Sequence, residues 1–519
     1  MNLAVWLARN AALGPDHPAV RHGEDVVTYA QLSDRVSRLA GFLRERGLTP
    51  GDRVGILQWN GLRLLETLLA AIHGGFCVVP VNARATAYEA AQVLDDAQVG
   101  AIVYGAEYAE HAMAVEGSQP LRICLQADAT ADVHYDEAIN QASGPLALQA
   151  VAPDDVAWLF YTSGTTGRPK GAMLTHRNLL AMVLAYLADL RDLRSDHVVL
   201  HAAPLTHGSG LYALPAIARG ATQVITTSRS FDPEEILATV RSRRVTDIAF
   251  LTPTMVKWLT EAHQGSPTPA QSLEHVVYGG APMYREDLRA ALQAFGPVFS
   301  QIYGQAEAPV TIARLTREDH VGESVQRADV LGAAGRAYTS VEVAVADGAG
   351  AGVIVPVGHG ELVTRSDVVM KGYWQNPDAT ADSLRDGWLR TGDVGRIDPD
   401  GLVFLVDRSK DVIISGGANV YPREVEEVIL QHDAVRAAVV VGAPDETWGE
   451  RVIAVLVLEP GGDQERVQQQ LDALCREYLS DYKRPRRYDW IDELPVSPYG
   501  KVLKREVRAR YWHGRERQV

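Results

Sequence analysis

The alternation of helix and strand patterns over the first hundred residues restricts the fold more than any other feature of this sequence. The stretch 28–47 begins with a plausible helix cap, Thr28, repeats leucine and valine at helical spacing, and ends at Gly47. A strand pattern, "DRVGILQWN", a helix pattern, "LRLLETLLAAIHGG", and a buried strand pattern, "FCVVPVN", follow. Because strands that alternate with helices favour parallel sheets with crossover helices, we predict an α/β fold.

The pattern changes between residues 331 and 407, where short strand patterns are separated by Gly, Pro and Asp. This stretch predicts a small, mostly antiparallel β-subdomain, and the residues after it predict a compact α+β module. A chain of 519 residues is also too long for one hydrophobic core. We therefore predict a large N-terminal domain, residues 1–407, and a C-terminal domain, residues 412–519, joined by the charged linker "DRSKD".

Charge and cysteine usage exclude several classes of protein. The formal net charge of -15 argues against a general nucleic-acid binder. Cys77, Cys124 and Cys475 lie far apart without C-x-x-C spacing, so we expect reduced, buried thiols rather than disulfides or zinc ligands. The sequence contains neither a secretory signal pattern nor an apolar run of the roughly 18–20 residues that span a bilayer. We therefore predict a cytoplasmic location and no transmembrane segment.

The stretch "YTSGTTGRPKG", residues 161–171, combines glycines, hydroxyl side chains and a lysine. Such a loop offers many unhindered N–H groups and hydroxyls to phosphate oxygens, although a generic Gly/Thr loop is more often a surface turn. It differs from the Walker pattern, which needs glycine before the lysine and a hydroxyl after it. Here Pro169 precedes Lys170 and Gly171 follows it, so we expect a different phosphate chemistry.

Further motifs follow this loop in a fixed order: "APLTHGSG" (203–210), "YGGAP" (278–282), "QIYGQAEAP" (301–309), "WLRTGD" (388–393), "DRSKDVIISGGANVYPREVE" (407–426) and "LPVSPYGKVLKRE" (494–506). With them the sequence resembles the adenylate-forming enzymes, which include acyl-CoA synthetases, adenylation domains and luciferase-like proteins. The likeness is strongest to the acyl- or aryl-CoA ligase branch and covers nearly the whole chain. It implies activation of a carboxylate by ATP, followed by transfer of the acyl group to a thiol.

The resemblance implies an ATP site in the N-terminal domain. The glycine loop would hold the β- and γ-phosphates, which leave as pyrophosphate, and Glu307 would bind Mg²⁺ through a hard carboxylate oxygen. Tyr303 would stack on adenine, while Asp393 would accept the ribose hydroxyls and Arg408 would contact the same region. Taken alone, these side chains would be read as ordinary surface or half-buried residues. The implied nucleotide-binding set is Thr162, Ser163, Gly164, Thr165, Thr166, Gly167, Lys170, Gly280, Ala281, Pro282, Tyr303, Gly304, Asp393 and Arg408.

Lys501 is the lysine that the resemblance assigns to catalysis, together with Glu307, Thr166 and His207. It would contact the carboxylate and the α-phosphate during adenylation, whereas a lysine in a basic C-terminal stretch is usually solvent-facing. Lys504 in the same stretch is the less favoured candidate. Because acetylation removes the lysine charge, a lysine acetyltransferase acting on Lys501 is a further hypothesis.

The C-terminal module is expected to serve the second half-reaction. By resemblance, residues 408–411 form a hinge centred on Lys410, and the domain swings so that the acyl-adenylate is first shielded and then exposed to a thiol. The implied coenzyme A residues are Gly416, Gly417, Trp448, Tyr482, Arg484 and Arg486. An aromatic face with guanidinium groups suits a phosphorylated adenosine, and a solvated basic patch is the alternative interpretation.

His207 resembles the aromatic gate residue of the acid pocket, although a buried structural histidine is an equal interpretation. The motif around it has no aspartate to bind an ammonium group, which disfavours amino acids. No arginine lies near these motifs to pair with a second carboxylate, which disfavours diacids. Ala306 replaces the threonine that the family usually has before the motif glutamate. The expected pocket residues, His207, Gly208, Tyr212, Val256, Gly279, Ala306, Pro309 and Val310, suggest a mostly apolar cavity. It would fit a medium-chain, branched, alicyclic or aryl acid.

The sequence therefore predicts an ATP-dependent carboxylic acid–CoA ligase that uses ATP, Mg²⁺ and coenzyme A. Two alternatives stay open. One is an acyl-AMP ligase that loads a carrier protein, and the other is a catalytically silent acyl- or nucleotide-binding homologue. A homodimer is compatible with the sequence, which does not determine the oligomeric state.

Overall fold

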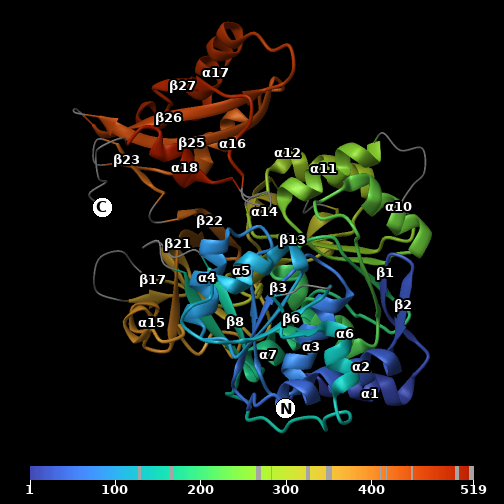
Figure 1. The fold of residues 1–519 in the computed structure, drawn as a ribbon. Coiled ribbons are helices and arrows are strands. Elements are labelled where there is room, and N and C mark those ends of the chain that lie inside the picture. Colours follow the sequence, from blue (N-terminus) through green and yellow to red (C-terminus); the bar gives the residue numbers. More distant parts are fainter. Residues whose placement is uncertain are drawn as a thin grey trace.

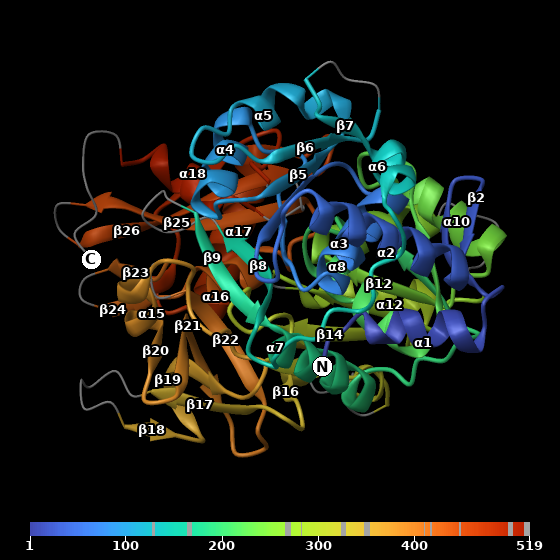
Figure 2. The same ribbon diagram turned by 60° about the horizontal axis from the view of Figure 1, so that its bottom comes forward.

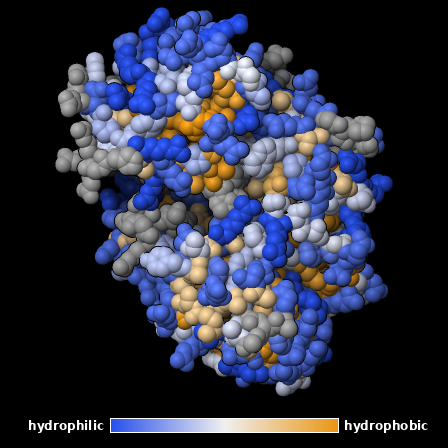
Figure 3. Space-filling model, turned by 45° about the horizontal axis from the view of Figure 1, so that its top comes forward, coloured by the Kyte–Doolittle hydropathy of each residue, from blue (hydrophilic) through white to orange (hydrophobic). Residues whose placement is uncertain are grey.

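The computed structural model describes residues 1–126, 130–162, 169–264, 271–281, 283–322, 328–346, 353–408, 411–415, 418–445, 448–496 and 502–512. It is a mixed α/β protein in which sheets and helices of the N-terminal domain lie below a smaller C-terminal domain (Figure 1). This confirms the predicted fold class. The face shown in Figure 3 is mainly hydrophilic, with an apolar area in its upper half. None of the helices in the described part of the chain combines the length and hydrophobicity needed to cross a membrane.

The largest sheet has nine strands in the order β16-β15-β14-β13-β12-β10-β11-β1-β2. Its central strands are parallel, and antiparallel pairs form both edges. The N-terminal hairpin joins this sheet over a long sequence distance, because Val20 lies opposite Gln223. The strands are β1 Pro18–His22, β2 Asp25–Thr28, β10 Val198–His201, β11 Thr222–Ile225, β12 Asp247–Leu251, β13 His275–Gly279, β14 Phe299–Tyr303, β15 Ala313–Leu315 and β16 Arg336–Ala337.

A second sheet has seven strands in the order β7-β6-β5-β3-β4-β8-β9. Its strands are parallel except for the pair β8–β9, in which Thr162 lies opposite Lys170. The glycine loop therefore joins two antiparallel strands, and β9 lies between it and the helix His176–Asp189. The strands are β3 Arg53–Leu57, β4 Cys77–Pro80, β5 Ala101–Tyr104, β6 Leu121–Cys124, β7 Val133–His134, β8 Val156–Thr162 and β9 Lys170–Thr175.

The helices pack around these sheets, and the predicted helix after Thr28 is confirmed. The Thr28 side chain accepts from the Gln31 N–H while the Gln31 side chain accepts from the Thr28 N–H, which forms a capping box. The side chains of Cys77, Cys124 and Cys475 are buried, as expected. The helices of this domain are α1 Val5–Leu13, α2 Tyr29–Glu45, α3 Leu62–His73, α4 Ala87–Asp96, α5 Ala109–Met113, α6 Tyr135–Gln141, α7 His176–Asp189, α8 Gly208–Leu211, α9 Ala213–Arg219, α10 Pro233–Arg243, α11 Pro253–Gln264, α12 Arg285–Phe295, α14 Ala328–Gly332 and α15 Pro377–Ser383. Short 3₁₀ turns are Ala106–Tyr108 and Glu318–His320.

The β-subdomain sheet is antiparallel and lies beside the two large sheets (Figure 2). Because β16 pairs with β15, residues 336–337 belong to the nine-stranded sheet, and the subdomain sheet begins at Glu342. Its strands are β17 Glu342–Ala346, β18 Ile354–Val355, β19 Gly358–Arg365, β20 Leu384–Arg385, β21 Trp388–Ile397 and β22 Val403–Arg408.

The C-terminal domain has a five-stranded sheet and its own apolar core. Asp407 and Arg408, the first two residues of the predicted linker, belong to β22 and pair with β21 in the subdomain sheet, whereas β23 pairs in the sheet of the C-terminal domain. Its elements are β23 Ile413–Ser415, β24 Ala418–Val420, α16 Pro422–Ile429, β25 Val435–Asp445, β26 Gly449–Leu458, α17 Gln464–Tyr478, the 3₁₀ turn η3 Asp481–Lys483, β27 Arg487–Trp490 and α18 Lys504–Ala509. Since each domain buries its own core, a change in their relative position need not disrupt either one.

Candidate active site

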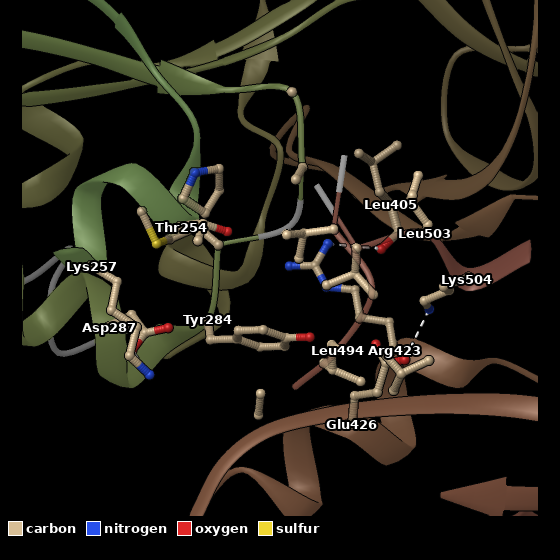
Figure 4. A pocket seen from close by; sticks show the side chains of 18 of the residues that line it. Thr254, Lys257, Tyr284, Asp287, Leu405, Arg423, Glu426, Leu494, Leu503 and Lys504 are labelled. Carbon is tan, nitrogen blue, oxygen red and sulfur yellow. Dashed lines mark hydrogen bonds and ion pairs between the residues drawn. The ribbon is translucent and has the colours of Figure 1, made fainter. Parts of the chain in front are cut away.

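A cleft of about 2170 Å³ lies between the two domains. The ends of β13 and β14 and the middle of β21 form part of its N-terminal side, where Gly280, Tyr303 and Asp393 line it. Side chains from α16 and α18, including Glu426 and Lys504, line the opposite side (Figure 4). Ligand sites of open α/β sheets usually lie at the carboxyl ends of the strands, and this cleft occupies such a position.

Tyr303 and Asp393 form a buried hydrogen-bonded pair between two different sheets. The Tyr303 hydroxyl donates to Asp393 Oδ2 at 2.6 Å, and the Gln305 amide donates to the same oxygen at 2.7 Å. Gln305 also donates to the Thr391 carbonyl at 2.9 Å. The carboxylate is 7% exposed, and a carboxylate can accept more hydrogen bonds than these two. The pair thus places an oriented acceptor beside an aromatic ring, as a nucleoside site requires.

The backbone next to this pair depends on glycine. Gly280 has a φ of +79°, a conformation that L side chains rarely adopt, and it follows directly after the end of β13. A Cβ atom on Gly304 would lie 2.5 Å from the Cα atom of Val310. Val310 itself has a φ of +51°, which is unusual for a β-branched residue. These constraints fix the turn between Tyr303 and the following motif glutamate, Glu307.

Glu307 contacts a residue that the sequence analysis did not single out. The Tyr373 hydroxyl donates to Glu307 Oε1 at 2.6 Å, and burial raises the pKa of that phenol. Lys170 Nζ lies 5.3 Å from the centroid of the Tyr373 ring. Glu307 and Lys170, which the sequence places in separate motifs, are therefore brought together through Tyr373. Gln305 was also missed, although its position inside the "YGQAE" motif could have indicated a role.

His207 lies on the cleft with its ring between a hydroxyl and an aromatic ring. Its Nδ1 is 3.0 Å from Thr206 Oγ1, and the Phe160 ring approaches it edge-on with a centroid distance of 5.6 Å. Desolvation lowers the pKa of His207 to about 4, so the ring is neutral at physiological pH. A Cβ atom on Gly208 would lie 3.3 Å from the Phe250 ring, so this aromatic ring closes the region behind His207.

The other predicted acid-pocket residues, all of which the structure describes, lie at different depths. The side chains of Tyr212 and Val256 are buried in the core, and Pro309 is buried as well. Ala306 is partly buried against the main core. Among these residues His207 is the one that lines the interdomain cleft. The described geometry thus supports His207 as a cleft residue, and the acid-pocket role of the deeper positions stays a prediction.

Comparison with known proteins identifies the family. A model of the AMP-binding enzyme matches residues 7–374, and a model of the AMP-binding enzyme C-terminal domain matches residues 424–501. The chain belongs to the AMP-binding enzyme family. This confirms the resemblance that the motifs indicated.

Relatives of this AMP-binding enzyme match it over almost its full length. The feruloyl-CoA synthase of an Amycolatopsis species is 40% identical over 517 residues, which is 98% of this chain and 99% of that protein. The fatty acid–[acyl-carrier-protein] ligase ScoC of Streptomyces coeruleorubidus is 36% identical over 97% of this chain and 95% of its own length. The structure of the amide bond synthetase McbA from Marinactinospora thermotolerans superimposes with a TM-score of 0.87, at 34% identity, over 98% of this chain and 100% of that one.

Several predicted residues of this AMP-binding enzyme lie outside the described residues. They are Ser163, Gly164, Thr165, Thr166, Gly167, Pro282, Lys410, Gly416, Gly417 and Lys501, and the side chains of Thr162 and Arg408 also lie outside the description. The chain is described up to Val496 and again from Val502, however. Leu494, Val496, Val502 and Leu503 line the cleft, and Val496 forms a β-bridge with Val502. The chain that flanks Lys501 therefore faces the N-terminal domain.

Lys504, the second lysine of this stretch, has a partner within the C-terminal domain. Its Nζ lies 2.9 Å from Glu426 Oε1, and the Glu426 side chain also accepts from the Val440 N–H at 2.8 Å. Glu426 is only 2% exposed, so the pair ties α18 to α16 and β25. Lys504 therefore has a structural role within the C-terminal domain, and this favours Lys501 as the reactive lysine.

The predicted coenzyme A residues that the structure describes lie away from the cleft. Trp448 is 48% exposed in the turn between β25 and β26, and Tyr482 is 39% exposed on η3. Arg484 and Arg486 both contact Asp481, with N–O distances of 3.5 and 2.7 Å. The guanidinium groups are therefore partly neutralised by a carboxylate within the same patch.

Proposed function

We propose that this AMP-binding enzyme is an ATP-dependent carboxylic acid–CoA ligase. In the first step a carboxylate attacks the α-phosphate of ATP, forming an acyl-adenylate and releasing pyrophosphate. In the second step the thiol of coenzyme A attacks the acyl carbon and displaces AMP. The main support is the cleft, which has the Tyr303–Asp393 pair on one side and the chain flanking Lys501 on the other. Such an arrangement lets a group from one domain act on a nucleotide held by the other.

The N-terminal domain would bind and orient ATP. Tyr303 would stack on adenine, Asp393 would accept the ribose hydroxyls, and residues 163–167 would hold the leaving phosphates. Lys501 would neutralise charge that develops between the carboxylate and the α-phosphate in the transition state. These roles divide binding and charge stabilisation between the two domains.

Glu307 is the residue that would hold Mg²⁺. It offers hard carboxylate oxygens, which suit this cation, and the described residues contain no cluster of three or more His, Cys, Asp or Glu side chains able to bind a metal ion. With Glu307 as the protein ligand, the phosphate oxygens of ATP would supply most of the remaining ligands of the cation. When bound, Mg²⁺ supplies charge neutralisation at the phosphates.

The second step would require the C-terminal domain to move. Trp448 and Tyr482 lie outside the cleft lining, so a rotation about residues 408–411 would be needed to bring their face to the acyl-adenylate. We propose Lys410 as the pivot, with residues 1–407 and 412–519 as the two bodies. Gly416 and Gly417 would then let the pantetheine arm pass close to the backbone.

The acid is proposed to be an aryl carboxylic acid of about the size of a hydroxycinnamate. Aromatic rings from Phe160, His207 and Phe250 surround the region next to Gly208, and aromatic rings pack favourably edge-to-face or offset. The feruloyl-CoA synthase at 40% identity supports the same class. Medium-chain, branched and alicyclic acids are the next candidates for this apolar region.

A panel of carboxylic acids tests this proposal directly. Pyrophosphate release and thioester formation are measured with ferulate, 4-coumarate, benzoate, cyclohexanecarboxylate and octanoate, with and without coenzyme A. We expect the highest kcat/KM with a hydroxycinnamate, and AMP release that depends on coenzyme A. Higher activity with octanoate would refute the aryl assignment, and absence of pyrophosphate release with every acid would refute the ligase.

A carrier-protein thiol is the second candidate for the acyl acceptor. The contacts of Arg484 and Arg486 with Asp481 reduce the positive charge available to the phosphates of coenzyme A, and the 36% identical ScoC is named for a carrier-protein ligase. AMP formation that depends on a phosphopantetheinylated carrier protein and not on coenzyme A would decide for it. The intact Tyr303–Asp393 pair and Glu307 oppose a catalytically silent homologue.

Three further proposals concern the protein in the cell. We propose a cytoplasmic location and a homodimer, which fractionation and light scattering would test. Acetylation of Lys501 would remove its charge and stop adenylation. Mass spectrometry that finds only unmodified Lys501 under all growth conditions would argue against this regulation.

A further inference from the structure

The segment 370–374 extends the glycine-loop hairpin as an additional strand-like edge. Its Lys371 N–H donates to the Met173 carbonyl, and the Met173 N–H donates to the Gly372 carbonyl, both at 2.9 Å. The Trp374 N–H donates to the Gly171 carbonyl at 2.8 Å. These bonds fix the segment against β9, immediately after the loop assigned to the phosphates.

The same segment holds Glu307 at two points. The Met370 N–H donates to the Glu307 carbonyl at 2.7 Å, and the Tyr373 hydroxyl donates to Glu307 Oε1 at 2.6 Å. The first bond fixes the backbone of Glu307 and the second orients its carboxylate. The hydroxyl is the donor and the carboxylate oxygen the acceptor, so the bond fixes the direction of one of the two Glu307 oxygens.

The ring of Tyr373 has a second contact. Lys170 Nζ lies 5.3 Å from its centroid, within the range of a cation–π interaction. The Tyr373 N–H donates to Thr380 Oγ1 at 2.9 Å, and the side chain is 8% exposed, so its position is well defined. One side chain thus contacts the glutamate of one motif and the lysine of another.

We propose that Tyr373 is a positioning residue for adenylation, whose hydroxyl orients Glu307 toward the divalent cation and whose ring holds Lys170 beside the glycine loop. The proposal rests on the proposed function in one respect, the assignment of the cation to Glu307. Partners that orient a metal-binding side chain typically change metal affinity by about 10- to 100-fold when they are removed. The hydroxyl and the ring have separate tasks, so separate substitutions can test them.

The experiment measures Mn²⁺ affinity in the presence of ATP and without acid, by electron paramagnetic resonance, together with KM for ATP and the thermal midpoint. Tyr373→Phe removes the hydroxyl and keeps the ring. We expect Mn²⁺ binding to weaken about tenfold while the thermal midpoint and KM for the acid change little. Tyr373→Leu removes the ring as well and should additionally raise KM for ATP about threefold, since the contact with Lys170 is lost.

Trp374→Phe is the matched control. The Trp374 indole donates to the Asp96 carbonyl at 3.1 Å, so this change removes a hydrogen bond of the same segment that does not involve Glu307. The Mn²⁺ affinity of this variant should stay within about twofold of that of the wild-type protein. In a Glu307→Gln background, Tyr373→Phe should have no further effect on Mn²⁺, because the two substitutions act on one interaction.

Unchanged or tighter Mn²⁺ binding in Tyr373→Phe would overturn the proposal, and tighter binding would mean that the hydroxyl competes with the cation. Unchanged Mn²⁺ binding in Glu307→Gln alone would overturn the cation assignment and this proposal with it. If the unchanged protein binds Mn²⁺ and ATP but forms acyl-CoA from no acid, the proposed function fails. The comparison of Tyr373→Phe with its control would still decide the role of Tyr373.

Discussion

The two sides of the interdomain cleft are built differently. On the N-terminal side, Tyr303 is the last residue of β14 and Asp393 lies within β21. Their contact at 2.6 Å is buried and reinforced by Gln305. On the C-terminal side, the residues that face the cleft come from α16 and from the chain around Lys501. The N-terminal side is therefore preorganised, whereas the C-terminal side presents its groups from a separate body.

Few described hydrogen bonds join the two sides. Lys257 Nζ donates to the Arg436 carbonyl at 3.3 Å, and Arg423 donates to the carbonyls of Leu405 and Gly332, both at 3.4 Å. Figure 4 shows Tyr284 of the N-terminal side pointing toward Arg423. Bonds of this length to backbone carbonyls are weak, which agrees with the domain movement proposed for the second step. We infer that nucleotide binding belongs to the rigid side and that the choice between the two steps belongs to the movable side.

The largest expected effect comes from Lys501→Ala. Removing a preorganised cation from the transition state should lower the rate of adenylation by about 10²- to 10³-fold. Thioester formation from preformed acyl-AMP should be nearly unchanged, because that step does not need the charge at the α-phosphate. Pyrophosphate release and single-turnover thioester formation are measured separately. Equal loss in both steps would remove Lys501 from this role.

Lys504→Gln provides the matched control for that lysine. Because Lys504 pairs with the buried Glu426, this variant should have a lower thermal midpoint, and its adenylation rate per folded molecule should stay within about threefold. A larger loss of adenylation in Lys504→Gln than in Lys501→Ala would reverse the assignment of the two lysines.

Asp393→Ala should have the next largest effect, confined to the rigid side. Each hydrogen bond to a charged group contributes about 1.5–3 kcal/mol, so at the lower end of this range loss of two ribose contacts should lower kcat/KM for ATP about 100-fold. KM for the acid should change little. Gln305→Leu, which removes one donor to Asp393, should have a smaller effect in the same direction. Unaltered kcat/KM for ATP in Asp393→Ala would contradict the ribose assignment.

Much of the fold could be predicted from local sequence signals. The helix that begins after Thr28 has its cap and its apolar spacing within one stretch, and both appear in the structure. Long-range pairings have no such signal: β1 joins the large sheet through β11, some two hundred residues away. The strand β9 was missed because nothing in the short segment after the glycine loop indicates that it pairs antiparallel with β8. Local patterns therefore predict elements better than they predict sheet order.

In the candidate site, too, local motifs predicted individual residues better than the contacts between them. Tyr303 and Asp393 stand in recognisable motifs, and the structure brings them into contact. Tyr373 is linked to Glu307 only through the fold, because the segment 370–374 aligns along β9. No spacing rule relates positions 307 and 373. The sequence motifs thus predicted the functional residues, but they could not predict a partner such as Tyr373, which reaches Glu307 only in the folded protein.

Lys410→Pro should affect the movable side alone. Proline fixes φ and removes the N–H, so a pivot at this position would lose the freedom to change its backbone conformation. We expect the thioester step to slow on the order of tenfold, with adenylation nearly unchanged. Lys410→Ala, which keeps backbone freedom, is the control and should preserve both steps. Unimpaired coenzyme A turnover in Lys410→Pro would contradict the hinge assignment.

The smallest expected effect concerns the pH response of His207 on the rigid side. Its folded pKa of about 4 lies below the unfolded value of about 6.5, so between these values the unfolded state binds more protons. The stabilising contribution of the neutral ring is therefore complete above about pH 6.5 and decreases as the pH falls toward 4. In His207→Phe, the loss of unfolding free energy between pH 7 and about pH 5.8 should be smaller by about 1 kcal/mol.

Urea unfolding at several pH values measures this difference. His201 and His275, whose pKa values burial lowers to about 4 and about 3, remain in both proteins, so the comparison isolates His207. An identical pH dependence in both proteins would show that the ring is solvated enough to keep its ordinary pKa. That result would place His207 on an open, wet part of the cleft and would weaken its assignment as the gate of an apolar acid pocket.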